Sequence, residues 1–157
     1  MKQIFFTLPF LLLTTAWGGA QQNDLTAFID KYKNEKGFTH AFVSKDLFEV
    51  ATQAKIADTD WKKLHHVIQN LGSLSLLAAD SIQNGLALYQ EARTLVGTDF
   101  DELLAVRDGQ DNVRVWAKAE DAVITDLVLL VGTADEFVLV CFAGQLELSN
   151  LAELPRL

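Results

Sequence analysis

Apolar residues recur at helical spacing in the first half of the chain. Leu25, Phe28, Ile29 and Tyr32 lie three or four positions apart, and this spacing predicts an amphipathic helix that ends near Gly37. Similar stripes follow candidate N-cap residues further along the chain. These predict additional helices that begin near residues 44, 59, 80 and 149.

The period changes from helical to extended after about residue 103. Val113, Val115 and Ala117 alternate with more polar residues, which predicts a strand over 113–119 after a tight turn at Asp108-Gly109. Residues 123–131 and 137–143 are predicted as two further strands. Their central portions are apolar at successive positions, so both faces are expected to be covered. Further extended candidates are residues 39–43, 73–79 and 103–107.

This order of elements predicts the class of the fold. Helices come mostly first and strands mostly last, which indicates an α+β domain rather than alternating α/β units. We expect a four- to five-stranded, mainly antiparallel sheet with a C-terminal β-meander, packed by four to five helices.

The first 20 residues have the pattern of a cleaved secretion signal. Lys2 precedes a short apolar run over residues 4–13, and Gly18-Gly19-Ala20 offers small residues for cleavage after Ala20. The alternatives are an N-terminal anchor or a buried helix. We therefore expect a signal peptide over residues 1–20 and a single domain over residues 21–157. No cysteine follows the apolar run, so a lipoprotein is not expected.

Charge and cysteine content narrow the choice of partners. The net charge is −8, and its dispersed acidic residues oppose binding to nucleic acid or anionic lipid. Beyond the signal, no apolar segment is long enough to span a membrane. Cys141 is the only cysteine, and its apolar neighbours predict a buried structural thiol rather than a reactive one.

The histidines give little support for a metal site. His65 and His66 are adjacent, and neighbouring residues on a helix point in different directions. A site would need Asp58, Asp60 or His40 to fold toward one of them, and surface histidine is the favoured alternative. We therefore predict no metal site.

Catalytic signatures are also missing from the sequence. No serine lies in a Gly-x-Ser-x-Gly elbow, and no glycine-rich phosphate loop occurs. The segment Asp108-Gly-Gln-Asp111 lacks the remaining ligands of a calcium loop, so a solvated acidic turn is favoured. We predict no catalytic residue and no cofactor, and thus a protein that is not an enzyme.

The meander carries more apolar residues than one covered face requires. If they share one sheet face and all helices pack on the other, they form an exposed binding patch; if the helices divide between both faces, they are buried. Trp116, flanked by Arg114 and Lys118, is the predicted contact residue for a partner. The residues in question are Trp116, Val128, Leu130, Val138, Val140 and Phe142.

The chain resembles domain-of-unknown-function family 4252 over nearly its whole length after the signal. The segments that carry the resemblance include Phe28-Ile-Asp-Lys-Tyr-Lys33, Phe42-Val-Ser-Lys45, Val113-Arg-Val-Trp-Ala-Lys118 and Glu136-Phe-Val-Leu-Val140. These motifs are structural. The resemblance implies an exported envelope protein of Bacteroidota that is periplasmic or surface-associated. It also suggests a role in envelope signalling. It brings no functional residues.

Three functional hypotheses follow. The first is a non-enzymatic envelope module that binds an unidentified protein partner through the meander. The second is a periplasmic carrier or sensor that holds a small apolar ligand between sheet and helices. The third is a hydrolase that uses scattered acids with His65 or His66, which would require polar side chains to converge in a cleft.

Overall fold

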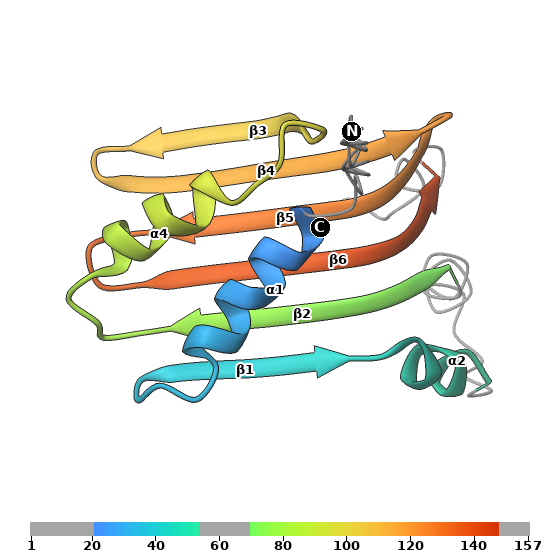
Figure 1. Cartoon of the computed structure of the whole chain (residues 1–157), viewed down its shortest axis with the longest axis horizontal. Helices are drawn as coiled ribbons and strands as arrows, with labels where there is room; N and C mark the ends of the chain where they lie inside the picture. Colours follow the sequence, from blue (N-terminus) through green and yellow to red (C-terminus); the bar gives the residue numbers. More distant parts are fainter. Residues whose placement is uncertain (1–20, 54–69, 148–157) are drawn as a thin grey trace, which may run out of the picture.

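The computed structural model describes residues 21–53 and 70–147. Within these ranges the chain forms an α+β domain with three helices and six strands, as the sequence predicts for the class (Figure 1). The predicted signal peptide, the last predicted helix and most of the helix predicted from residue 59 lie outside the described residues. The elements are α1 (Gln21–Tyr32), β1 (Phe38–Val43), α2 (Lys45–Gln53), β2 (Leu71–Ala79), α4 (Gly85–Thr94), β3 (Asp101–Asp108), β4 (Asp111–Glu120), β5 (Val123–Gly132) and β6 (Phe137–Glu147).

All strands belong to one sheet in the order β1-β2-β6-β5-β4-β3. Each of the five pairings is antiparallel, and β3 to β6 form the predicted C-terminal meander. The sheet has six strands where the sequence predicts four or five. Each of the six strands overlaps one of the six extended candidates in the sequence, including residues 39–43 in β1 and 103–107 in β3. Only the number of strands expected in the sheet was too low.

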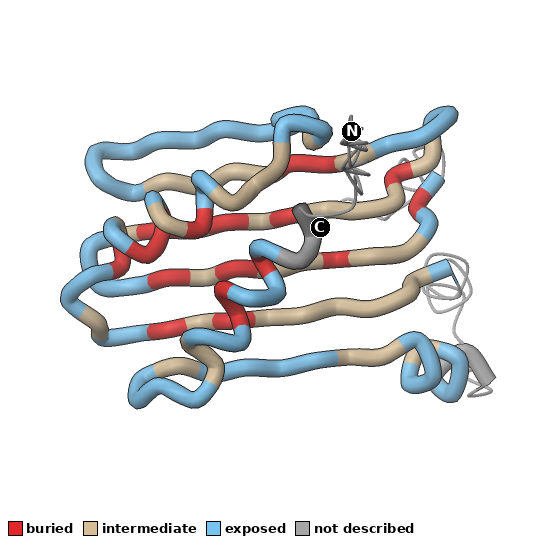
Figure 2. The backbone as a smooth tube through the Cα atoms, in the orientation of Figure 1, coloured by how far each residue is buried: buried red, intermediate tan, exposed pale blue. Residues whose placement is uncertain are grey.

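Helices α1 and α4 pack on the same side of the sheet (Figure 1). The predicted stripe of α1 is confirmed, since Leu25, Phe28 and Ile29 are only 3–6 % exposed. The ring of Phe28 lies 5.7 Å from that of Phe137 on β6. The most deeply buried residues follow the middle of the strands beneath these helices (Figure 2). We call this side of the sheet the helix side.

The start of α4 differs from the prediction. The chain turns at Ser81, whose φ is +59°, and the helix begins at Gly85 rather than near residue 80. A Cβ atom at Gly85 would lie 2.3 Å from the carbonyl oxygen of Thr133, so only glycine allows this close approach of helix and loop. Ile82 precedes the helix and still packs against the core.

A polar contact fixes α1 against α4. The Lys31 ammonium donates to Oε1 of Glu91 at 2.8 Å, and the Tyr32 hydroxyl donates to Oε2 at 2.8 Å. The bond from Lys31, with help from Tyr32, holds the pKa of Glu91 below its usual range. The contact joins α1 to α4 across residues about 60 positions apart in the sequence, in addition to the packing of Leu25, Phe28 and Ile29 on the core.

The apolar stripe of the helix predicted from residue 59 includes Leu71, but Leu71 is not helical. Leu71 and Gly72 belong to β2, where Leu71 pairs with Gly144 on β6. A Cβ atom at Gly72 would meet the carbonyl oxygen of Ala143 at 2.7 Å. The tertiary pairing with β6 therefore overrides the helical spacing at these two positions.

Candidate functional site

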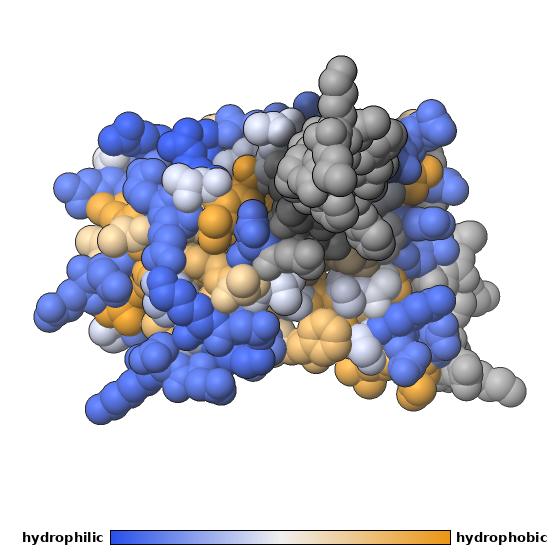
Figure 3. Space-filling model, in the orientation of Figure 1, coloured by the Kyte–Doolittle hydropathy of each residue, from blue (hydrophilic) through white to orange (hydrophobic). Residues whose placement is uncertain are grey.

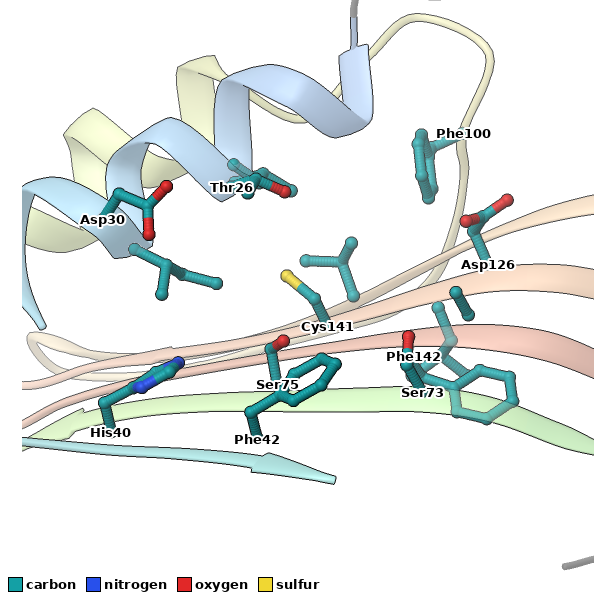
Figure 4. Close-up of a pocket in the computed structure, with 15 residues that line it drawn as sticks. Thr26, Asp30, His40, Phe42, Ser73, Ser75, Phe100, Asp126, Cys141 and Phe142 are labelled. Atoms are coloured by element: carbon teal, nitrogen blue, oxygen red, sulfur yellow. The ribbon is translucent and has the colours of Figure 1, made fainter. Parts of the chain in front are cut away.

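A pocket of about 320 Å³ lies between α1 and the sheet on the helix side. Its lining comes from α1, β1, β2, β5 and β6, together with Phe100 from the segment before β3. Figure 4 shows the helix above the pocket and the strands below it. The pocket falls at the small end of the range for small-molecule sites.

The walls of the pocket are apolar. Leu25 and Ile29 project from α1, and Val128 lies opposite them on β5. Phe100 and Phe42 stand at two sides of the space (Figure 4). Phe42 is 59 % exposed, so the pocket meets solvent at that ring.

The floor of the pocket is polar. Ser73, Ser75 and Cys141 come from neighbouring strands and point toward the space under α1 (Figure 4). Ser75 is the direct cross-strand partner of Cys141, which places both groups on the helix side. Among the described residues, the hydroxyls of Ser73 and Ser75 have no hydrogen-bond partner.

The Cys141 thiol is neutral at physiological pH. Burial first, and then the negative charge of Asp126, raise its pKa to about 12. A thiol that stays protonated is a poor nucleophile and a poor metal ligand. The raised pKa agrees with the unreactive thiol that the sequence predicts. The side chain is half-buried rather than fully buried, and its sulfur atom contributes to the pocket floor.

Negative charge dominates among the described residues that line the pocket. Asp30 and Asp126 lie at its rim, His40 lies at the β1 side, and no lysine or arginine belongs to the lining. Lys33 pairs with Asp30 at 2.6 Å. The ammonium of Lys118 lies 3.0 Å from Asp99, and the charge of Asp126 on the neighbouring strand also acts on it. The Thr125 hydroxyl donates to Oδ2 of Asp126 at 2.9 Å.

The predicted contact residues lie on the helix side. Trp116 is only 8 % exposed and belongs to the main core cluster, so its ring has little surface to offer a partner. Arg114 forms an ion pair with Glu102 on the adjacent strand, and Lys118 pairs with Asp99. A contact role for these three residues stays a prediction, and the burial of Trp116 argues against direct contact by that ring.

The six apolar residues of the meander do not share one face. Trp116 is paired with Val128, and Leu130 alternates with Leu129 on β5, so these three face the helices. Val138 and Val140 alternate with Leu139 on β6 and face the opposite way. That expectation was wrong because uninterrupted apolar strands carry no alternation from which to assign faces. Phe142 also lies on the side opposite the helices, where it is buried with Ala117 in a second, smaller core cluster next to the residues of β5.

The side opposite α1 and α4 carries continuous rows of apolar residues. One row crosses all six strands through direct cross-strand partners, namely Ala41, Leu76, Val140, Leu129, Val115 and Leu104. The next row is Thr39, Ala78, Val138, Val131, Val113 and Val106. We call these twelve residues the open face.

The open face is uncharged and accessible. All of its residues are half-buried or exposed, whereas Leu77, Leu139 and Leu130 on the helix side have no exposure at all. At the β3 edge, Leu104 and Val106 are 46 % and 49 % exposed. By contrast, Figure 3 shows mostly hydrophilic side chains on the described part of the helix side, with smaller apolar patches.

Candidate metal ligands do not cluster in the part of the chain that the structure describes. No group of three or more histidine, cysteine, aspartate or glutamate side chains gathers there to hold a metal ion. His65, His66, Asp58 and Asp60 lie outside the described ranges. Asp108 and Asp111 close the β3–β4 hairpin, where Gly109 has a φ of +59°, so the predicted acidic turn is confirmed.

Comparison with known proteins places the chain in a family. The model for "Domain of unknown function (DUF4252)" matches residues 32–154, which is most of the chain. The chain belongs to this family. The resemblance seen in the sequence is thereby confirmed. No curated protein and no solved structure matches the chain. None of the described helices is long and apolar enough to cross a membrane.

The residues of the pocket floor were not singled out from the sequence. A signal was present, because Ser73 and Ser75 alternate with Leu74 and Leu76 within an otherwise apolar strand. Such alternation indicates that one side of the strand faces a more polar environment.

Proposed function

We propose that this DUF4252 protein is a non-enzymatic, exported envelope protein that acts as a protein-interaction module through its open face. The partner is another protein that presents an apolar surface of similar size. The observation that carries the proposal is the contrast between Leu129, which is half-buried at the centre of the sheet, and its neighbour Leu130, which is fully buried. Export is supported by the signal-like pattern of residues 1–20.

The size of the open face supports a protein partner. Six strands about 4.8 Å apart and two rows that each take about 6.7 Å of strand length give an area of roughly 380 Å². Apolar patches of this size on monomers are often functional. A standard interface buries about 800 Å² on each partner, so the open face would form its apolar core and surrounding polar residues its rim.

Charge supports the same choice of partner. The chain has a net charge of −8, yet none of the twelve open-face residues is charged. A charge-free surface on an acidic protein excludes recognition by ion pairing and leaves burial of apolar area as the source of affinity. Nucleic acid and anionic lipid headgroups are therefore poor partners for this surface.

Photo-cross-linking in cells tests the proposal. A photoreactive phenylalanine analogue placed at Leu129 should give one defined protein adduct. The same analogue at Gln90, which is exposed on α4, serves as the matched control and should give none. Adding the substitution Val140→Lys next to Leu129 should remove the adduct, because it places a charge in the docking surface.

The proposal is contradicted if Leu129 and Gln90 give the same set of adducts, or if Leu129 gives none. An adduct of twice the chain mass would identify the partner as a second copy. Circular dichroism of the Val140→Lys variant must show a folded chain before loss of the adduct is interpreted.

A further inference from the structure

We propose that the pocket between α1 and the sheet binds a small amphipathic cation, an organic amine with a short apolar body. This site lies on the opposite side of the sheet from the open face, so it is independent of the proposed protein partner. Three features of the pocket carry the inference: its apolar walls, its unpartnered hydroxyls and its negative rim.

The walls can hold an apolar chain. Leu25 and Ile29 on α1 and Val128 on β5 enclose the space from both sides. Each methylene group that leaves water for such a site gains about 0.8 kcal/mol. The volume of about 320 Å³ limits the occupant to a small molecule and excludes a folded segment of another protein.

The floor calls for a ligand that can form hydrogen bonds. Ser73 and Ser75 both point into the pocket (Figure 4), and neither hydroxyl has a partner among the described residues. A hydroxyl can accept as well as donate, so it can accept a hydrogen bond from an ammonium group. A pure hydrocarbon would leave both hydroxyls covered and without a partner, which is costly.

The rim favours a positive ligand over a negative one. Asp126 contributes one carboxylate and Asp30, which is paired with Lys33, a second, while the described lining contains no lysine or arginine. The field of Asp126 also reaches the floor, where it helps to keep the Cys141 thiol protonated. The rings of Phe42 and Phe100 add aromatic surface beside which a cation is stabilised.

Matched eight-carbon probes test the charge preference. Octylammonium, octan-1-ol and octanoate share one apolar chain and differ in the charge of the polar end. Calorimetric titration of the wild-type chain, below the micelle-forming concentration, should rank octylammonium first and octanoate last, with at least a tenfold difference in Kd. Amide shifts on adding octylammonium should centre on Ser73, Ser75 and Cys141.

Two pocket variants and one matched control locate the site. Ser75→Phe should fill the pocket and abolish binding of octylammonium. Leu76→Phe, one residue further along β2 and on the opposite side, should leave binding unchanged. Asp126→Asn should reduce the preference for octylammonium over octanoate at least threefold.

Several results would overturn the inference. These are equal or tighter binding of octanoate, amide shifts that centre on the open face, or unchanged binding in Ser75→Phe. The ranking of the three probes is measured on the wild-type chain, so it tests the preference for a cation even if Ser75→Phe does not fold. Because Leu129 lies on the other side of the sheet, its substitution should leave octylammonium binding intact, which separates this test from that of the open face.

Discussion

Truncation of two adjacent leucines measures how differently the two sides of the sheet are covered. Leu129 and Leu130 follow one another on β5 in the centre of the sheet. Leu130 faces the helices and has no exposed surface, whereas Leu129 belongs to the open face and is half-buried. Leu129→Ala and Leu130→Ala remove the same three carbon atoms from the same strand, so the difference between them reports on the surroundings alone.

The expected loss of stability is larger for Leu130. Removing three fully buried carbon atoms costs about 2.4 kcal/mol in transfer free energy alone. The enclosed cavity adds to this loss, so Leu130→Ala should cost about 3–4 kcal/mol, within the range of buried leucine truncations. Leu129→Ala leaves no enclosed cavity and removes partly solvated carbon atoms, so it should cost only about 1 kcal/mol.

Urea unfolding followed by circular dichroism measures both losses. The chain should be dilute, because a partner copy on the open face would add concentration-dependent stability. The expected difference of about 2–3 kcal/mol is a large part of the total stability of a domain of this size and is easily resolved. Equal losses at Leu129 and Leu130 would mean that the open face is already covered in the isolated chain, which would refute the reasoning behind the docking surface.

Three further predictions concern single side chains. At pH 8 a pKa of about 12 leaves Cys141 with roughly 10³-fold less thiolate than free cysteine, and the higher nucleophilicity of that thiolate offsets only part of the difference. Iodoacetamide should therefore modify Cys141 at least about 50-fold more slowly than free cysteine. A modification rate that levels off near pH 9 would contradict this prediction. The interactions that lower the pKa of Glu91 stabilise the fold fully above the usual glutamate pKa of about 4.3, and this stabilisation is lost as the pH falls through the pKa of Glu91 in the folded chain. The difference in unfolding free energy between wild type and Glu91→Gln should therefore shrink in acid. A difference that stays constant with pH would contradict this prediction. Gly132→Ala would place a Cβ atom 2.4 Å from Cβ of Tyr89 and should lower the unfolding free energy by about 2–3 kcal/mol, measured by urea unfolding. Gly109→Ala is the control, because Gly109 has open space around it and only its positive φ opposes a side chain, so this variant should lose about 1 kcal/mol.

The sequence predicted the long periodic elements well. The stripe from Leu25 to Tyr32 forms α1, and residues 113–119, 123–131 and 137–143 all lie within observed strands. The turn at Asp108-Gly109 is also where β3 meets β4. In each case the local pattern and the tertiary packing favour the same structure, which is the condition under which periodicity is informative.

The sequence could not show which side of each strand is covered. On β5 and β6 apolar residues fill both sides, so the run from Leu127 to Val131 contains no polar position to mark solvent. The assignment depends on where α1 and α4 pack, which involves contacts between residues far apart in the chain, such as Phe28 with Phe137. The pocket is formed by the same packing of α1 on the sheet, so it could not be predicted from the sequence either.

Both proposed surfaces follow from the size of the sheet relative to its helices. Six strands about 4.8 Å apart span nearly 30 Å, whereas each helix covers a width of about 10 Å. Helices α1 and α4 lie on the same side, so together they cover about two thirds of that side and leave room for the pocket beside α1. The opposite side receives neither helix, and its rows through Leu76, Val140 and Leu129 remain accessible. Substitutions in the pocket, such as Ser75→Phe, should therefore affect ligand binding alone, and substitutions on the open face, such as Val140→Lys, should affect partner binding alone.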